Sequence, residues 1–320
     1  MDSLLASRLL QKLSFLGLHS QDHLISYLTL LEARNYAQST LHAIVGMIKK
    51  LLQHLPTERR LIVTDDLTLT TSLDIDRFVS SASAKGLSPS TINTSLSALK
   101  AFFDFLLEDG RMQIQPIIRR RHRLFAPATL PKPMAEEDLI TFFKVIDSLR
   151  DRLIFLLMLR CGLRVSEVCR LTWQAVDLQA ATVRVNNGKG LVDRIAYISP
   201  DLEKTLALWH ERSGQSHYLF PSRKVRLAPL GRGDVHWQMK KYLRLAGISK
   251  QYSPHCLRHT FATQLLNAGV SLEVLKELMG HRSIQMTLRY TQLYESTKRQ
   301  QYDQAMENIE RRQAYLGGER

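Results

Sequence analysis

Apolar residues in the first third of the chain recur every three or four positions, which is the spacing of one buried helix face. This spacing predicts helices over 20–34, from Ser39 to Leu52, over 74–85 and from Ser88 to Asp109. Ser39 is the candidate N-cap of the second helix, and Ser88-Pro89 opens the last with an N-cap and a first-turn proline. Four helices within about 90 residues indicate a small bundle.

The second half of the chain is helical at both ends and alternates in polarity between them. Helices are expected at about 135–147, 151–160, just after Ser166, 200–212, 234–246, 254–268, 271–279 and 295–315. Residues 182–185 and 194–198 alternate like strands, and the Asn-Asn-Gly-Lys-Gly sequence at 186–190 has the chemistry of a hairpin turn. The chain is therefore expected to be mainly α-helical with one small antiparallel β-sheet.

A length of 320 residues suits two domains, and a change of composition separates them. Between the two halves lie a basic run and three prolines, namely Arg119, Arg120, Arg121, His122, Arg123, Pro127, Pro131 and Pro133. Because proline stiffens the chain and removes backbone donors, this segment is expected to form an extended linker. The expected division is an N-terminal extension (1–19), a helical domain (20–110), a basic linker (111–133) and a second domain (134–320).

The charge balance narrows the class of partner. Lys and Arg number 44 against 30 Asp and Glu, which gives a formal net charge of +14 at pH 7. Such a surface attracts polyanions, above all a phosphate backbone. No apolar run approaches the ~20 residues of a membrane span. The stretch 1–17 lacks the basic start and solid apolar centre of a signal peptide, and the three cysteines have no paired-ligand spacing. A reduced, cytoplasmic protein without a membrane partner is expected.

Three polar residues stand at helical spacing in the last quarter of the chain. His255, Arg258 and His259 occupy i, i+3 and i+4 of one predicted helix, so they share a face. Zinc is the first rival explanation, because the two histidines are correctly spaced and His281 could complete three ligands. However, the metalloprotease pattern needs a glutamate where Cys256 stands, and the arginine would repel a cation. Cys256 itself points toward the apolar side. Neither a metal site nor a cysteine nucleophile is therefore predicted.

A second set of polar residues follows in the next two helices. Gly280 ends the first of these helices, which places His281 in a turn. Ser283 then caps a short helix that would carry Tyr290 about two turns along. Tyr294 lies on the same face, four residues later. One compact helical hairpin is thus expected to bring the histidines, the arginine and a tyrosine together.

These residues, with others upstream, resemble the signature of a known family. The motifs are Cys161-Gly162-Leu163-Arg164-Val165-Ser166-Glu167, Gly188-Lys189-Gly190, Tyr218-Leu219-Phe220-Pro221, His255-Cys256-Leu257-Arg258-His259, Gly280-His281 and Arg289-Tyr290-Thr291. In this order and spacing they resemble the tyrosine recombinases, also called phage integrases, in a compact Xer-like form. The helical region at 20–110 is similar, through its arrangement and the stretch 88–93, to the SAM-like core-binding domain of that family. The resemblance implies such a domain followed by a mixed helical catalytic domain.

The resemblance also implies a role for each side chain. Tyr290 would be the nucleophile that forms a 3′-phosphotyrosyl intermediate, since its distance from His281 fits the family and that of Tyr294 does not. Guanidinium groups bind phosphate bidentately and keep their protons, so Arg164 and Arg258 would hold the scissile phosphate. The remaining site residues are His255 as proton acceptor for the tyrosine, His281 as phosphate support, Lys189 as general acid for the 5′-oxygen, and Glu167 and His259 as supporting groups. The candidate DNA contacts are Arg119, Arg120, Arg121, Arg123 and Arg194.

Together these features predict a site-specific recombinase that cuts and rejoins duplex DNA during integration, excision or resolution of DNA elements. The bond energy stays in the phosphotyrosyl ester, so no cofactor is expected. The resemblance further implies a homotetramer on two DNA sites, joined through a C-terminal helix over 295–315, with room for accessory proteins. Three alternatives stay open, of which a zinc hydrolase that uses the histidines is the most remote. A type IB topoisomerase would share the chemistry, and a non-catalytic DNA-binding protein would share the charge and the helices.

Overall fold

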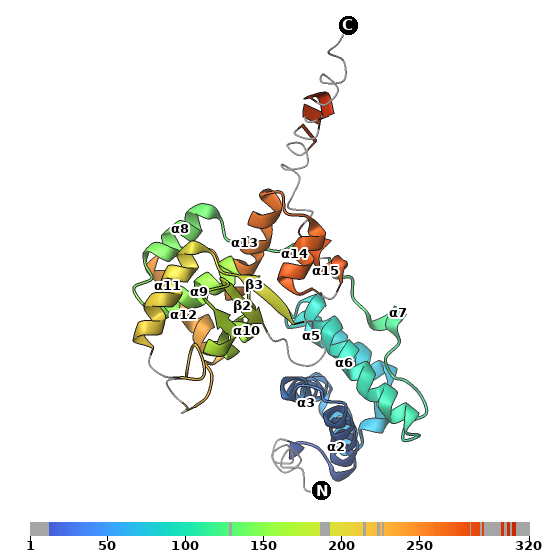
Figure 1. Cartoon of the computed structure of the whole chain (residues 1–320). Helices are drawn as coiled ribbons and strands as arrows, with labels where there is room; N and C mark the ends of the chain where they lie inside the picture. The colour runs from blue at the N-terminus through green and yellow to red at the C-terminus, as the bar shows by residue number, and fades with distance from the viewer. Residues whose placement is uncertain are drawn as a thin grey trace. The chain divides into compact units, whose positions relative to one another are not determined.

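The computed structural model describes residues 13–127, 130–185, 193–213, 216–222, 225, 227–281, 283–288, 290, 302–303, 306–307 and 309–311. The chain divides between residues 128 and 129 into two compact units. Each unit buries an apolar core of its own. In Figure 1 the first unit runs from blue to green and the second from green to red.

The first unit is built from helices. They are α2 (Leu18–Ala33), α3 (Gln38–Gln53), α4 (Thr57–Asp65), the 3-10 turn η1 (Leu67–Leu69), α5 (Ser72–Ala84), α6 (Pro89–Glu108) and the short α7 (Arg119–His122). The four predicted helices are present as α2, α3, α5 and α6. Ser88 caps α6 as predicted, since its hydroxyl accepts from the Thr91 N–H at 3.3 Å. The predicted N-cap at Ser39 is wrong, because α3 begins at Gln38. The sequence gives little sign of α4, whose one buried residue, Val63, makes no apolar stripe.

The segment after α6 differs from the extended linker that its prolines suggest. Ile117 joins the apolar core of the first unit, and His122 at the end of α7 is buried. Asn93 on α6 binds the backbone of Leu124 in both directions, donating to its carbonyl at 2.8 Å and accepting from its N–H at 2.9 Å. Residues up to Leu124 therefore belong to the first unit, because an apolar side chain and an amide on α6 hold them there.

The second unit surrounds a small sheet with helices. Its elements are α8 (Glu136–Lys144), α9 (Leu149–Arg160), α10 (Val165–Arg170), η2 (Trp173–Ala175), β1 (Val176–Asp177), β2 (Thr182–Val185), β3 (Arg194–Tyr197), α11 (Pro200–Arg212), α12 (Arg232–Leu245), α13 (Pro254–Asn267), α14 (Leu272–Met279) and α15 (Ile284–Leu288). The sheet is antiparallel in the order β1-β2-β3, with Val183 opposite Ala196. Strands β2 and β3 are those predicted from the alternation, whereas β1 has only two residues and gives no pattern.

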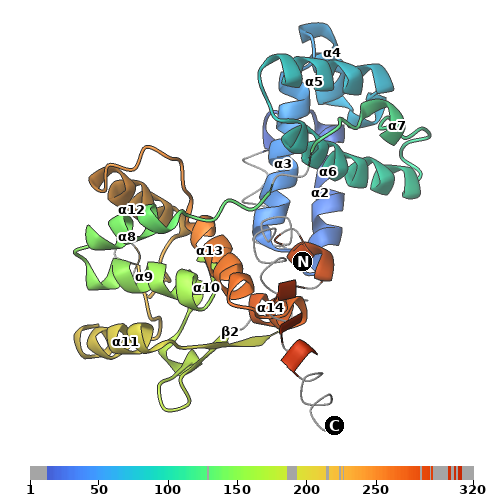
Figure 2. The same cartoon turned by 90° about the horizontal axis from the view of Figure 1, so that it is seen from above.

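Helix α9 is the centre of this unit. Every residue from Leu153 to Leu159 is buried, and α9 packs against both α11 and α13. Helix α14 packs in turn against α13 and β3, and Figure 2 shows α14 beside one end of α13. These contacts bring three segments together: the residue before α10 (Arg164), the helix α13, and the turn after α14 that contains His281. Among the described residues, no helix has both the length and the apolar content needed to cross a membrane.

Candidate active site

Helix α13 carries three of the residues singled out in the sequence. His255 is exposed, His259 is partly buried, and Arg258 has only 1% of its surface exposed. The rings of His255 and His259 meet edge to face, with centroids 4.6 Å apart. Cys256 is buried, in agreement with its place on the apolar side of the helix. The two histidines thus form a pair that runs from the surface toward the interior.

Tyr290 lies next to this pair. Helix α15 has only five residues, so Tyr290 stands in a turn beyond the helix and not two turns along it as the sequence suggests. Its side chain is 4% exposed and packs in a small apolar cluster with Phe261 and Met279. The Tyr290 hydroxyl lies 2.8 Å from Nδ1 of His259, within hydrogen-bond distance. The sequence gives His259 only a supporting role, whereas the structure places it against the tyrosine hydroxyl.

Arg258 is held by backbone carbonyl groups from two distant segments. Its Nη1 donates to the carbonyl of Gly162 after α9, and its Nη2 donates to the carbonyl of Met279 in α14. Gly162 has left-handed backbone (φ 59°), and a Cβ atom there would lie 2.5 Å from the Phe261 ring, so only glycine allows this approach. Burial and the nearby Arg164 charge lower the pKa of Arg258 to about 9. The guanidinium is still protonated near pH 7, and an anion bound beside it would offset the cost of burying its charge next to Arg164.

Arg164 immediately precedes α10 and is held by Glu167 one turn later. Its Nη1 donates to Oε1 of Glu167 at 2.6 Å, and its backbone N–H donates to Oε2 at 2.8 Å. Burial acts to raise the pKa of Glu167, but the hydrogen bonds and charge of Arg194, with those of Arg164, lower it. Glu167 is therefore ionised. It orients Arg164, whose side chain is still 24% exposed and can meet a ligand.

His281 stands in the turn after α14, as the sequence predicts. The turn begins at Gly280, whose backbone is left-handed (φ 60°). Nδ1 of His281 lies 2.9 Å from the Thr287 hydroxyl. Burial, with the charges of Arg258 and Arg164, lowers the pKa of His281 to about 3, so the ring is neutral near neutral pH. When the Thr287 hydroxyl donates to Nδ1, the ring keeps its proton on Nε2 as a donor for an anion.

The charges of these groups do not balance. Three guanidinium groups, from Arg164, Arg194 and Arg258, surround one carboxylate, so three minus one leaves two positive charges in excess. A phosphodiester carries one negative charge and gains more as its phosphorus becomes pentacoordinate, which is the charge that such a site stabilises. Nowhere in the described part of the chain do three His, Cys, Asp or Glu side chains gather as a metal site requires.

Comparison with known proteins agrees with this geometry. The chain matches the phage integrase family over residues 132–297, and the phage integrase N-terminal SAM-like domain over residues 22–110. The chain belongs to the phage integrase family. It is 36% identical to tyrosine recombinase XerA of Pyrococcus furiosus over 255 residues, which cover 78% of this chain and 84% of XerA. It is 30% identical to tyrosine recombinase XerC of Xanthomonas campestris over 257 residues, which cover 78% of this chain and 79% of XerC.

Solved integrase structures share the fold of this integrase-family chain. A lambda integrase dimer bound to a COC′ core site matches it with a TM-score of 0.68 at 19% identity, covering 84% of this chain and 94% of that one. The Tn1549 transposon integrase in complex with a circular intermediate DNA matches with a TM-score of 0.65 at 21% identity, covering 84% and 94%. The predicted fold class, mainly helical with a small antiparallel sheet, is confirmed.

Some expected features of this integrase lie outside the described residues. Lys189, expected as the general acid, is in the undescribed stretch 186–192 between β2 and β3. Tyr294 and most of the expected C-terminal helix over 295–315 also fall outside the described part of the chain.

Arg194 differs from its expected role as a DNA contact. Its side chain is 5% exposed, and its guanidinium binds both oxygens of Glu167, at 3.2 and 2.9 Å. Strand β3 alternates between buried and exposed residues, and Arg194 shares the inward face with Ala196. The sequence gives no sign of this, because polarity alone would turn Ile195 and Tyr197 inward, whereas both are exposed in the structure. Because its guanidinium is committed to a buried carboxylate, Arg194 belongs to the active site and not to a DNA-facing surface.

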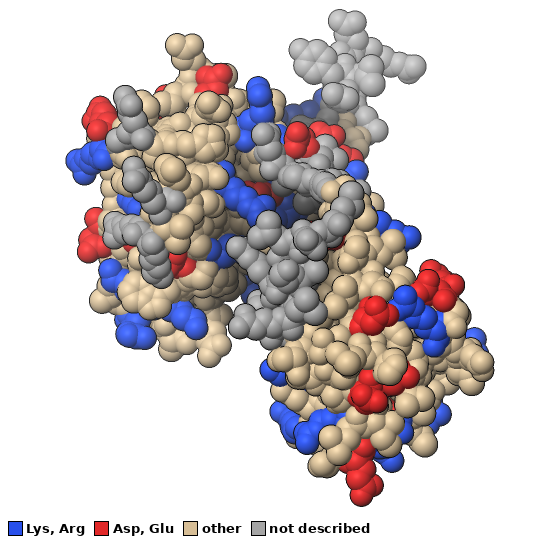
Figure 3. Space-filling view, turned by 90° about the horizontal axis from the view of Figure 1, so that it is seen from below, with Lys and Arg blue, Asp and Glu red and all other residues tan. Residues whose placement is uncertain are grey.

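The four arginines of the basic run in the first unit are exposed, and two of them border a groove. Arg119 and Arg123 line an open groove of about 530 Å³ beside α6, and Arg121 is paired instead with Asp76, to which its Nε donates at 3.0 Å. The other groove residues are Ser90, Asn93, Thr94, Leu96, Ser97, Lys100, Ile117, His122 and Ala126. Figure 3 shows that, on the side of each unit in view, basic and acidic side chains are mixed. The groove has the hydroxyl, amide and cationic groups that bind a phosphate backbone.

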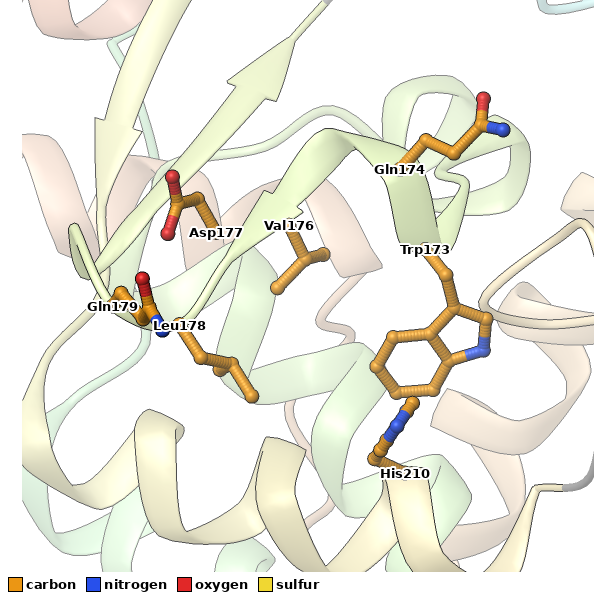
Figure 4. Close-up of a pocket in the computed structure, with 7 residues that line it drawn as sticks. All are labelled: Trp173, Gln174, Val176, Asp177, Leu178, Gln179 and His210. Atoms are coloured by element: carbon orange, nitrogen blue, oxygen red, sulfur yellow. The ribbon is translucent and has the colours of Figure 1, made fainter.

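A second pocket, of about 360 Å³, lies near η2 and β1 (Figure 4). Its main feature is an edge-to-face contact between the rings of Trp173 and His210, whose centroids are 4.6 Å apart. The other lining residues are Gln174, Val176, Asp177, Leu178 and Gln179. None of them is a candidate catalytic residue, so this pocket is separate from the active site.

Proposed function

We propose that this chain is a site-specific recombinase that cuts and rejoins double-stranded DNA through a 3′-phosphotyrosyl bond at Tyr290. The observation that carries the proposal is the 2.8 Å contact between the Tyr290 hydroxyl and His259, close to a buried arginine in a site with two excess positive charges. Membership of the phage integrase family, with tyrosine recombinases XerA and XerC among the relatives, supports the same reaction.

Cleavage begins when Oη of Tyr290 attacks the scissile phosphorus. A bond forms between the phosphorus and the tyrosine oxygen, and the bond to the 5′-oxygen breaks. A tyrosine hydroxyl ordinarily has a pKa of about 10, so attack at neutral pH needs a base. We infer that Nδ1 of His259, which lies 2.8 Å from the hydroxyl, takes the proton. His255, the acceptor expected from the sequence, contacts the His259 ring from the surface side.

The departing 5′-oxygen needs a proton, which Lys189 would supply as general acid. The 5′-hydroxyl of a partner strand then attacks the phosphotyrosyl ester and releases Tyr290 by the reverse chemistry. One phosphodiester is exchanged for another, so the reaction needs neither a nucleotide cofactor nor a metal ion.

Arg164, Arg258 and His281 would bind the non-bridging oxygens of the phosphate. Arg258 is fixed by backbone carbonyl groups and Arg164 by Glu167, so neither has to reorganise when charge develops. Removing one such donor typically costs ~3–4 kcal/mol of transition-state stabilisation. Arg164→Ala is therefore expected to slow cleavage about 10²- to 10³-fold.

The structures of relatives suggest the assembly. Lambda integrase has been solved as a dimer bound to a COC′ core site and as a tetramer bound to a Holliday junction. For this chain we infer a homotetramer on two duplex sites, in which residues 295–315 dock onto a neighbouring copy. The groove bordered by Arg119 and Arg123 would lie along a DNA backbone. Such an enzyme would act on DNA in the cytoplasm, with or without accessory proteins.

A nicked substrate tests the reaction directly. The protein is incubated with a nicked duplex that carries the sequence it selects from fragments of its source genome. The nick lets the cleaved end diffuse away, so a covalent protein–DNA adduct accumulates. Tyr290→Phe should abolish the adduct, Tyr294→Phe should retain it, and a chelator should have no effect. An adduct that survives Tyr290→Phe and is lost with Tyr294→Phe would show that the nucleophile is assigned wrongly.

A second substrate separates the recombinase from a type IB topoisomerase. Two duplexes with differently labelled strands are mixed with the wild-type protein, and the products are examined for strands joined across the two duplexes. A recombinase forms these crossed products. A topoisomerase religates each duplex to itself, so adduct formation without crossed products would favour that alternative.

A further inference from the structure

Arg194 binds two separate parts of the active site from its place at the start of β3. Its Nη1 and Nη2 donate to the two oxygens of Glu167, at 3.2 and 2.9 Å. Its Nε donates to the carbonyl of Leu278 in α14 at 2.9 Å. One buried side chain therefore joins β3, the Glu167 carboxylate on α10 and the end of α14.

The bidentate bond fixes the plane of the Glu167 carboxylate. A carboxylate bound by one group can rotate, but the paired N–H groups of a guanidinium hold both of its oxygens. The same two oxygens accept the side-chain Nη1 and the backbone N–H of Arg164, at 2.6 and 2.8 Å. The orientation of Arg164 therefore depends on Glu167, and that of Glu167 depends on Arg194.

The other end of Arg194 lies against the turn that leads to His281. A Cβ atom on Gly280 would lie 3.0 Å from Cδ of Arg194 and 3.1 Å from its Nη1. The carbonyl of Gly280 also accepts from Nη2 of Arg164 at 3.4 Å. The Arg194 stem thus occupies the space that a side chain at Gly280 would fill, and it supports the turn from which His281 extends.

A buried ion pair is weak evidence for stability, because the cost of removing two charges from water often exceeds their attraction. The side chains of Arg194 and Glu167 are 5% and 7% exposed, so both pay that desolvation cost. Apolar side chains could fill the same space without removing two charges from water. The geometry instead matches a requirement for orientation, since the Arg194 guanidinium donates to Glu167, which holds Arg164, and to the carbonyl of Leu278, three residues before His281.

We propose that Arg194 is a positioning residue for strand cleavage. It aligns Arg164 on the scissile phosphate through Glu167, and it holds the turn that presents His281. This inference rests on the proposed function, in which Arg164 and His281 bind the phosphate. Arg194 itself touches neither the phosphate nor the DNA backbone.

The test compares variants of the full-length protein on the nicked duplex described above. Arg194→Met removes the bidentate bond, and Arg184→Met is the matched control, because Arg184 is an exposed arginine on the neighbouring strand β2. Arg194→Met should slow adduct formation about 10- to 100-fold, with DNA affinity and its salt dependence unchanged. Arg184→Met should cleave at the wild-type rate. If Arg194→Met does not fold, Arg194→Lys carries the same test, because a lysine ammonium cannot hold both carboxylate oxygens.

Two further measurements distinguish positioning from a general structural defect. In a Glu167→Gln background, Arg194→Met should cause a smaller loss than it causes in the wild-type protein, because the part of its effect that passes through Glu167 to Arg164 is already gone. On a duplex whose scissile phosphate is an uncharged methylphosphonate, the defect of Arg194→Met should shrink as that of Arg164→Ala does, because less charge has to be neutralised.

Several results would overturn the inference. Wild-type cleavage by Arg194→Met would do so, as would an equal loss on phosphate and methylphosphonate substrates. If Arg194→Met reduced the slope of the logarithm of the DNA-binding constant against the logarithm of the salt concentration by about 0.9, Arg194 would contact a phosphate of the duplex itself. A wild-type protein that forms no Tyr290-dependent adduct would overturn the proposed function, and this inference with it.

Discussion

Gly280 offers a quantitative test of how the turn before His281 is built. The Gly280→Ala change places a methyl group in left-handed backbone, which costs an L-residue about 1–2 kcal/mol. It also brings that methyl to 3.0 Å from Cδ of Arg194, closer than ordinary van der Waals contact. Gly247 provides a matched control, because its backbone is similar (φ 67°) and nothing lies within 4 Å of its Cβ position.

The two variants should therefore differ by the cost of the contact with Arg194. Gly247→Ala should lower the free energy of unfolding by about 1–2 kcal/mol. Gly280→Ala should lower it by about 2–5 kcal/mol, since overpacking typically adds 1–3 kcal/mol to the backbone strain. Urea denaturation followed by tryptophan fluorescence measures this difference in the second unit, because all three tryptophans, Trp173, Trp209 and Trp237, lie there.

The rate of DNA cleavage should also differ between Gly280→Ala and Gly247→Ala. Displacing Arg194 disturbs Glu167 and Arg164, so Gly280→Ala should form the covalent adduct about 10- to 100-fold more slowly than wild type. Gly247→Ala should cleave normally once folded. Equal stability losses and equal cleavage rates in the two variants would refute the reasoning, because Gly280 would then matter only for its backbone angle.

Three other predictions follow from the electrostatics. Asp74→Ala should destabilise the first unit by about 2–4 kcal/mol, because the buried Asp74 carboxylate binds Arg59 and closes the capping box of α5. Helix melting by circular dichroism should report this loss, whereas a shift in the tryptophan transition alone would contradict it. Burial and the charges of Arg258 and Arg164 lower the pKa of His281 to about 3, whereas the unfolded chain keeps a pKa of about 6.5. Because the unfolded chain therefore binds this proton first, the free energy of unfolding should fall as the pH drops from about 6.5 toward 3. The urea-stability profile of His281→Asn should be flatter over that range, and an unchanged profile would argue against a buried neutral ring. DNA affinity should fall about 10³- to 10⁵-fold between 50 and 200 mM salt as counterions are released, and a flat titration would contradict backbone contact.

Much of this protein is determined by short-range pattern. Apolar spacing locates most of the helices and the two main strands, because period 3.6 and period 2 belong to the backbone itself. The same periodicity puts His255, Arg258 and His259 on one face of α13, since residues three and four apart are neighbours on any helix. The order of motifs from Arg164 to Tyr290 indicated the family, and the matches over 22–110 and 132–297 show it.

Only the tertiary structure decided which side chains meet. Two histidines share a face of α13, and the choice of His259 as partner of Tyr290 depends on where a turn 31 residues away places the tyrosine hydroxyl. Arg194 looks like one more basic residue until the packing of α14 against β3 buries it beside Glu167. Contacts between distant segments depend on displacements of about an ångström and on the desolvation of charges, neither of which leaves a period in the sequence.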